Sequence, residues 1–213
     1  MIVVLDYGMG NIHSIVKALK LFYGEVRYTN DPSEIRKARA LVLPGDGHFE
    51  TAMSNLKGEK QDLIYEHVSK QKALLGICIG FQVLFEDSSE TIVNKNSIGE
   101  GSAPTLVKGL GILAGKIRRF NSTNQLRIPH MGWNQLKPTY MASSPAYFSQ
   151  PMYFIHSYRP EQVDDSIVLT TTTYGNETFA STVSKNSVFA CQYHPEKSDS
   201  AGLHFLKDWV KSI

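Results

Sequence analysis

The sequence predicts an α/β fold, with a mostly parallel central sheet flanked by helices and additional antiparallel strands in the C-terminal half. In the first half, short apolar runs alternate with segments of helical periodicity, which is typical of a parallel sheet covered on both faces. In the second half, short runs rich in β-branched and aromatic residues are joined by turn residues, which indicates antiparallel strands. The length of 213 residues suits a single domain over residues 1–213.

The first half contains four predicted strands, at residues 2–6, 25–29, 40–43 and 73–77. Helical spacing of apolar residues predicts helices after Asn11, over residues 32–38, around residues 52–56 and over residues 63–69. Asn11 is a candidate N-cap because its side chain can accept a backbone hydrogen bond. The carboxyl ends of parallel strands share one edge, so the loops after Asp6, Leu43 and Ile77 are expected to meet where sites form.

The second half contains predicted strands at residues 116–120, 152–158, 167–173, 178–183 and 188–193, followed by an amphipathic helix over residues 200–210. Residues 88–104 are polar and glycine-rich, and we expect them to form a surface loop.

Composition excludes several function classes. Lys plus Arg is 22 and Asp plus Glu is 20, with no basic block, so nucleic acid is not an expected partner. No signal peptide and no apolar stretch long enough to cross a bilayer are present, so no membrane association is expected. The two cysteines do not make a disulfide framework, and free thiols in a cytoplasmic protein are expected.

The segment Gly76-Ile77-Cys78-Ile79-Gly80 is the most informative motif. It follows a predicted strand and precedes a helical pattern over residues 81–86. A nucleophile flanked by small residues two places away at a strand-to-helix turn is typical of a nucleophile elbow. The dipole of the following helix would favour the reactive thiolate. The competing interpretation is a buried cysteine in an apolar strand.

A catalytic cysteine needs a base and a group that orients the base. The segment Tyr193-His194-Pro195-Glu196 follows a predicted strand. Proline biases His194 toward an extended conformation, so that Glu196, two residues on, points to the same side. One imidazole nitrogen can then bond the carboxylate while the other faces Cys78. A zinc site is the alternative for these ligand types, although they have no companions at metal spacing.

An oxyanion needs backbone N–H donors. The glycine-bracketed loop at residues 44–48 follows a predicted strand, and Gly45 and Gly47 are candidate donors. The N–H of Ile79, directly after the nucleophile, is another. An ordinary turn is the alternative for this loop.

These residues together resemble the triad class of glutamine amidotransferases, also called class I. Within the class, the chain resembles the glutaminase subunits of imidazole glycerol phosphate synthases, from Ile2 to the last helix and apart from a long stretch around residues 91–104. The motifs that carry the resemblance are Leu75-Gly76-Ile77-Cys78-Ile79-Gly80-Phe81-Gln82, His194-Pro195-Glu196-Lys197-Ser198, Asp6-Tyr7-Gly8-Met9-Gly10-Asn11, Pro129-His130-Met131-Gly132-Trp133-Asn134 and Tyr153-Phe154-Ile155-His156-Ser157-Tyr158.

The resemblance implies that Cys78, His194 and Glu196 release ammonia from glutamine without a cofactor or a metal. It implies substrate contacts by Gln82, Glu90, Ser157 and Tyr158. It also implies a heterodimer with a (β/α)8-barrel cyclase of histidine and purine metabolism, which would receive the ammonia. The residues expected to face that partner include Asn11, Met131, Trp133 and Tyr153.

One position departs from the family pattern. Asp46 stands in the oxyanion loop where a small apolar residue is usual, and a carboxylate aimed at the site would disfavour negative charge there. Three alternatives stay open on sequence: a paralogue that supplies ammonia to another synthase, such as a surface-sugar amidotransferase, a binding module without catalysis, and a cysteine hydrolase of the same fold.

Overall fold

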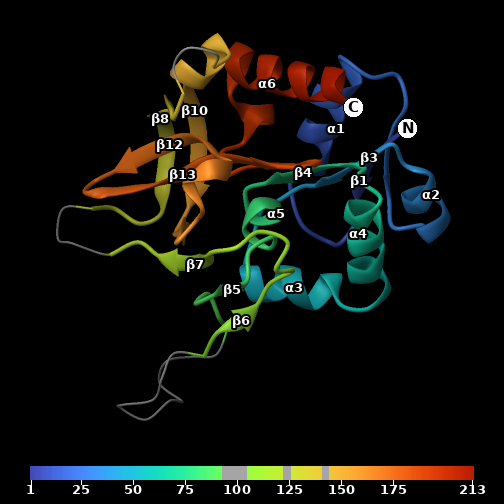
Figure 1. The fold of residues 1–213 in the computed structure, drawn as a ribbon, viewed down its shortest axis with the longest axis horizontal. Coiled ribbons are helices and arrows are strands. Elements are labelled where there is room, and N and C mark those ends of the chain that lie inside the picture. The colour runs from blue at the N-terminus through green and yellow to red at the C-terminus, as the bar shows by residue number, and fades with distance from the viewer. Residues whose placement is uncertain (93–104, 122–125, 141–143) are drawn as a thin grey trace.

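The computed structural model describes residues 1–92, 105–121, 126–140 and 144–213 (Figure 1). Within these ranges the main sheet has eight strands in the order β2-β1-β3-β4-β14-β13-β12-β9. The pairs from β2 to β14 are parallel, and those from β14 to β9 are antiparallel. The predicted α/β architecture, with antiparallel strands added by the C-terminal half, is confirmed.

The first half forms the elements that the sequence predicts. They are β1 (Ile2–Leu5), α1 (Ile12–Lys20), β2 (Val26–Thr29), α2 (Pro32–Lys37), β3 (Ala40–Leu43), α3 (Phe49–Leu56), α4 (Glu59–Ser69), β4 (Ala73–Ile77) and α5 (Ile79–Gln82). The Asn11 side chain accepts a hydrogen bond from the Ser14 N–H at 3.5 Å, so the predicted N-cap is confirmed.

The second half is richer in strands than the sequence pattern indicated. It contains β5 (Asp87–Ser88), β6 (Val107–Lys108), β7 (Lys116–Arg119), β8 (His130–Gln135), β9 (Lys137–Pro138), β10 (Pro151–His156), β11 (Tyr158–Glu161), β12 (Val168–Tyr174), β13 (Glu177–Lys185), β14 (Val188–Cys191) and α6 (Asp199–Ser212). Strands β8 and β10 form a two-stranded antiparallel ribbon, and β11, β7, β5 and β6 form a further sheet.

Helices cover both faces of the main sheet (Figure 1). Val3 and Leu5 of β1 belong to a hydrophobic cluster that includes residues of α2, α3 and α4. Ile2 and Val4 belong to a second cluster, with residues of α1 and α6. Alternate residues of a strand point to opposite faces, so β1 is buried on both sides, as its uninterrupted apolar sequence requires.

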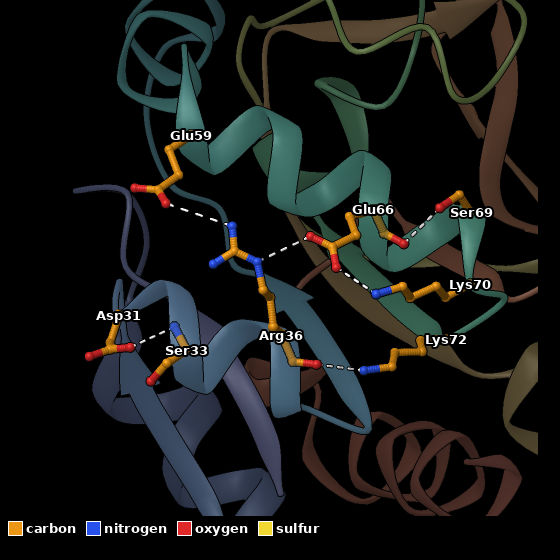
Figure 2. A network of polar contacts seen from close by, with 8 residues as sticks. All are labelled: Asp31, Ser33, Arg36, Glu59, Glu66, Ser69, Lys70 and Lys72. Atoms are coloured by element: carbon orange, nitrogen blue, oxygen red, sulfur yellow. Dashed lines mark hydrogen bonds and ion pairs between the residues drawn. The ribbon is translucent and has the colours of Figure 1, made fainter.

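A network of polar contacts joins α2 to α4 (Figure 2). Arg36 lies between the carboxylates of Glu59 and Glu66, at 3.8 and 3.2 Å, and Glu66 also pairs with Lys70. The Lys72 ammonium donates to the Arg36 carbonyl at 2.7 Å. Lys72 directly precedes β4, so the network lies at the amino-terminal edge of the sheet, opposite Cys78, and we assign it a structural role.

Two sequence predictions need correction. The helical pattern over residues 81–86 gives only one turn, α5, because the backbone N–H groups of residues 109–113 bond the carbonyls of Val83, Leu84, Phe85 and Glu86. The strand predicted over residues 152–158 is divided at Ser157 into β10 and β11, which pair with different partners. Most of the loop expected at residues 88–104 lies outside the described residues, and Ser88 belongs to β5.

His67 makes stability depend on pH. It is buried on α4, with Nε2 at 3.0 Å from the Ala73 carbonyl oxygen. Burial lowers its pKa to about 4, whereas an unfolded histidine has a pKa of about 6.5. Between these values the unfolded state binds more protons than the folded state. The contribution of neutral His67 to the free energy of unfolding is therefore complete above pH 6.5 and is lost as pH falls toward 4. We expect the loss to be on the order of 3 kcal/mol.

Urea unfolding of the wild type and His67→Gln at several pH values between neutral and pH 4 measures this dependence. The stability difference between the two proteins is expected to change with pH, because only the wild type carries the linked proton. A difference that is constant with pH would contradict the assignment.

Candidate active site

Cys78 lies at a sharp turn between β4 and α5. Its φ of 52° and ψ of −104° are in a region that non-glycine residues rarely adopt, and such strain is common at functional sites. A Cβ atom at Gly80 would clash with the Leu43 carbonyl oxygen, and one at Gly76 would lie 2.6 Å from the Gly80 carbonyl oxygen. A side chain at either position would therefore clash with the backbone, which explains the two glycines of the motif.

His194 lies beside this turn because β14 pairs in parallel with β4. Cys191 is in register with Ile77, and the Cys78 N–H donates to the Cys191 carbonyl at 2.9 Å. Both segments therefore leave the sheet at the same edge. Residues far apart in sequence are brought together by this one pairing.

The imidazole of His194 is oriented by Glu196, as the sequence predicts. Nδ1 lies 2.8 Å from Glu196 Oε1, and both side chains are buried. Nε2 is also buried and has no hydrogen-bond partner among the described residues. Burial alone would lower the pKa of His194, but the negative charges of Cys78 and Glu196 outweigh it and raise that pKa to about 10. The Cys78 sulfur and the Glu196 carboxylate therefore favour the protonated form of the imidazole.

The Cys78 sulfur has two polar neighbours besides the imidazole. The Ile155 carbonyl oxygen lies 3.8 Å from Sγ and accepts from the thiol. The side-chain amide of Gln192 donates to Sγ, also at 3.8 Å. Sequence reasoning missed Gln192, although a residue two places before His194 on an extended segment points to the same side.

The predicted oxyanion loop packs directly against the elbow. A Cβ atom at Gly45 would clash with the backbone at Ile77 and Ile79, so only glycine allows this approach. Gly47 has a φ of 129°, which also favours glycine. The first N–H groups of a helix have no acceptor within the helix, and Ile79 is the first residue of α5. The structure therefore brings Gly45 and Ile79 together.

The surroundings of the loop add two observations. Tyr7, in the loop after β1, donates from its hydroxyl to the Pro44 carbonyl, so the loops after β1, β3 and β4 converge as expected. Asp46 is exposed, and it does not contribute a buried charge to the site.

Gln82 and Tyr158, two of the predicted substrate residues, contact each other. The Gln82 side-chain amide nitrogen donates to the Tyr158 carbonyl at 3.0 Å and to Gln192 Oε1 at 2.9 Å. Both of its hydrogens are thus used inside the protein. Ser157 is half-buried, and its carbonyl accepts from the Phe120 N–H.

Glu90, the remaining predicted substrate residue, is part of a charged cluster. Its Oε2 accepts from the Phe49 N–H at 2.8 Å, and its Oε1 lies 4.0 Å from His48 Nε2. Burial raises the pKa of Glu90, against the influence of His48 and Arg119. Arg119 also hydrogen-bonds Tyr158, whose pKa is raised, first by burial and then by Glu90. His48 and Arg119 had not been identified from the sequence.

The residues expected to face a partner lie on an exposed surface. Met131 and Trp133 of β8 are 58% and 51% exposed, and Trp133 meets the half-buried Tyr153 of β10 edge to face at 6.2 Å. The Tyr153 carbonyl accepts from the His194 N–H at 2.9 Å, which links this surface to the base. Asn11 is half-buried as the cap of α1.

The described residues contain neither a cluster suited to a metal ion nor a helix suited to a membrane. In residues 1–92, 105–121, 126–140 and 144–213, no three His, Cys, Asp or Glu side chains are grouped so that they could hold a metal ion. Over the same ranges, no helix has both the length and the apolar character needed to cross a membrane.

Known proteins share both the sequence and the fold. Residues 3–213 match the family model described as glutamine amidotransferase class-I. Imidazole glycerol phosphate synthase subunit HisH of Thermosynechococcus vestitus is 42% identical over 219 residues, which cover 100% of this chain and 97% of that protein. The subunit of the same name from a Synechococcus species is 40% identical over 99% of this chain and 93% of that protein.

The fold comparison agrees with these relatives. A crystal structure described as a glutamine amidotransferase superposes with a TM-score of 0.67 at 19% identity, over 99% of this chain and 98% of that one. The chain belongs to the class-I glutamine amidotransferase family, and within it to the HisH subunits of imidazole glycerol phosphate synthase.

Proposed function

We propose that this chain hydrolyses glutamine to glutamate and ammonia at Cys78, as the glutaminase subunit of imidazole glycerol phosphate synthase in histidine biosynthesis. The observation that carries the catalytic assignment is the buried His194 imidazole. It is bonded to Glu196 through Nδ1, and its pKa is raised by the interaction with Cys78. Relatives named HisH that align over the whole chain carry the pathway assignment. A paralogue serving another synthase is not favoured.

The reaction needs two steps at one carbon atom. The Cys78 thiolate attacks the side-chain amide carbon of glutamine, a C–S bond forms, and the amide oxygen becomes an oxyanion held by the Ile79 N–H and the loop glycines Gly45 and Gly47. The C–N bond breaks as the His194 imidazolium gives its proton to the nitrogen, which leaves as ammonia. Water then attacks the thioester while neutral His194 takes a proton from it. Glutamate leaves as its carboxylate, one further proton goes to solvent, and the thiolate and imidazolium are restored.

Glutamine offers an ammonium and a carboxylate for recognition. Glu90 is suited to the ammonium because its carboxyl group is partly buried, and a cation beside it would oppose the burial that raises its pKa. Tyr158 interacts with Glu90, and both Tyr158 and its chain neighbour Ser157 are partly buried. Gln82 retains its side-chain oxygen for the substrate, since both amide hydrogens are already donated.

The ammonia passes to a partner subunit, which we propose is a (β/α)8-barrel cyclase. Trp133 and Met131 expose large apolar surface close to the base, which suits a docking interface. Tyr153 contacts Trp133 on that surface, and we propose that Asn11 also faces the partner. Because Cys78 and Cys191 are both free thiols, a reducing compartment such as the cytoplasm suits the chain.

Labelling by a glutamine analogue that carries an electrophilic carbon tests the nucleophile. In the complete enzyme we expect one adduct per chain, located at Cys78 by mass spectrometry, and none in Cys78→Ala. Cys191→Ser is the matched control, because Cys191 is a fully buried thiol whose pKa is raised by burial, and this variant should label normally. Labelling of Cys78→Ala at the wild-type rate would contradict the assignment.

The isolated chain is expected to turn over glutamine negligibly. Cys78 is 6% exposed and His194 is 1% exposed, so substrate has little access to the sulfur without a rearrangement. Glutamate release should rise at least about a hundredfold when the cyclase subunit and its ligand are added. Rapid release by the chain alone would contradict this expectation.

Removing the Trp133 side chain should weaken the heterodimer. A central aromatic anchor typically contributes about 2 kcal/mol or more to an interface, so Trp133→Ala should raise Kd about thirtyfold or more by calorimetry. Leu21→Ala is the control, since Leu21 is 62% exposed but follows the C-terminal end of α1, at the opposite edge of the sheet. Equal effects of the two substitutions would argue against the proposed interface.

A further inference from the structure

We propose that Gln192 is a further catalytic residue, whose side-chain amide donates a hydrogen bond to the Cys78 sulfur and stabilises the thiolate, with Gln82 holding that amide in the donating orientation. The inference rests on the proposed function, since a stabilised thiolate serves the attack on glutamine.

The contacts of Gln192 leave little freedom. Its side chain is fully buried, and its backbone N–H donates to the Ser181 carbonyl at 2.9 Å. Its Nε2 lies 3.8 Å from Cys78 Sγ, and its Oε1 accepts from Gln82 Nε2 at 2.9 Å. Each end of the amide therefore has a different partner.

The orientation of the amide follows from the hydrogens of Gln82. Gln82 Nε2 carries two hydrogens, one given to the Tyr158 carbonyl and one to Gln192 Oε1. A flipped Gln192 would place two NH2 groups face to face and turn its oxygen toward the sulfur. Both changes are unfavourable beside a thiolate, so the bonding pattern selects the donor orientation.

A chain of two buried histidines ends at the Tyr158 carbonyl, which also accepts from Gln82. Neutral His156 donates from Nδ1 to the Tyr158 carbonyl at 2.8 Å, so its Nε2 accepts from His130 Nδ1 at 2.9 Å. His130 Nε2 then accepts from the Asn134 amide at 3.1 Å. Burial lowers the pKa of both histidines, which keeps them neutral near pH 7. Donation therefore runs from Asn134 through the two histidines to the Tyr158 carbonyl, and separately from Gln82 through Gln192 to Cys78.

The sulfur needs such a donor because other neighbours favour the thiol. The Ile155 carbonyl accepts from the thiol and faces the thiolate with a partial negative charge. Helix α5 is only one turn long, so the helix dipole expected from the sequence is small. Among the described side chains, Gln192 supplies a neutral donor that complements the imidazolium of His194.

Other titratable groups do not change charge in the useful range. Tyr7, from the loop after β1, and Cys191, on β14, both interact with Cys78, and burial raises the pKa of each. They stay neutral at and moderately above pH 7. His194, which follows β14, also interacts with Cys78, and Glu196 acts on the sulfur through His194. A change in thiol reactivity after a substitution at Gln192 is therefore not caused by Tyr7 or Cys191.

The test measures how the rate of Cys78 alkylation by iodoacetamide depends on pH in a Cys191→Ser background. In this reaction a C–S bond forms and iodide leaves. Gln192→Met retains the volume but cannot donate, and it should move the midpoint of the rate profile up by about one pH unit, which is tenfold slower reaction near neutral pH. Gln192→Glu is isosteric but places an acceptor beside the sulfur, and it should move the midpoint further. In the complete enzyme kcat should fall about tenfold for Gln192→Met with KM nearly unchanged.

A packing role makes the opposite prediction, because the isosteric Gln192→Glu would then behave like the parent and Gln192→Met would be the worse variant. Gln82→Met provides a second route, since it frees the Gln192 amide to flip without touching the sulfur, and it should shift the midpoint by a smaller amount in the same direction. Unchanged midpoints in the folded variants would overturn the proposal. Alkylation needs no turnover, so a parent that fails to hydrolyse glutamine would count against the proposed function and leave the Gln192 result valid.

Discussion

The parallel pairing of β14 with β4 is the constraint on which the rest of the site depends. It sets Cys191 beside Ile77, so the chain leaves both strands at one edge, where the Cys78 sulfur interacts with the His194 imidazole. A shift of one residue in this register would turn His194 to the other side of its segment. The glycine contacts with the Leu43 carbonyl and the Ile77 backbone are possible only because β3 lies on the other side of β4.

Burial then determines how strongly the groups act on one another. Cys78, Gln192 and His194 are nearly or fully removed from water, so each hydrogen bond and charge is less screened than at a surface. The same burial makes an unpaired polar atom costly, which is why Nε2 of His194 and Oε2 of Glu196 are notable as buried atoms without a partner in the described ranges. An unpaired Nε2 on His194 suits a group that exchanges protons with a substrate.

Local rules explain what the sequence predicted. The elbow, the His-Pro-Glu segment and the helices of the first half follow from spacing, proline geometry and apolar periodicity, all within a few residues. The length of α5 did not follow, because residues 109–113 take the carbonyls that would have continued the helix. The ribbon of β8 and β10 and the contacts of Gln192, His48 and Arg119 also depend on pairings distant in sequence, which no local pattern encodes.

The thiolate–imidazolium pair is the central claim, and NMR titration of the His194 imidazole tests it most directly. With Cys78 present, the interactions of the imidazole with the sulfur and with Glu196 should together outweigh burial and hold the pKa of His194 at about 10. In Cys78→Ala only Glu196 opposes burial, so the pKa of His194 should fall by more than one unit. An imidazole that titrates at the same pH in both proteins would contradict the account.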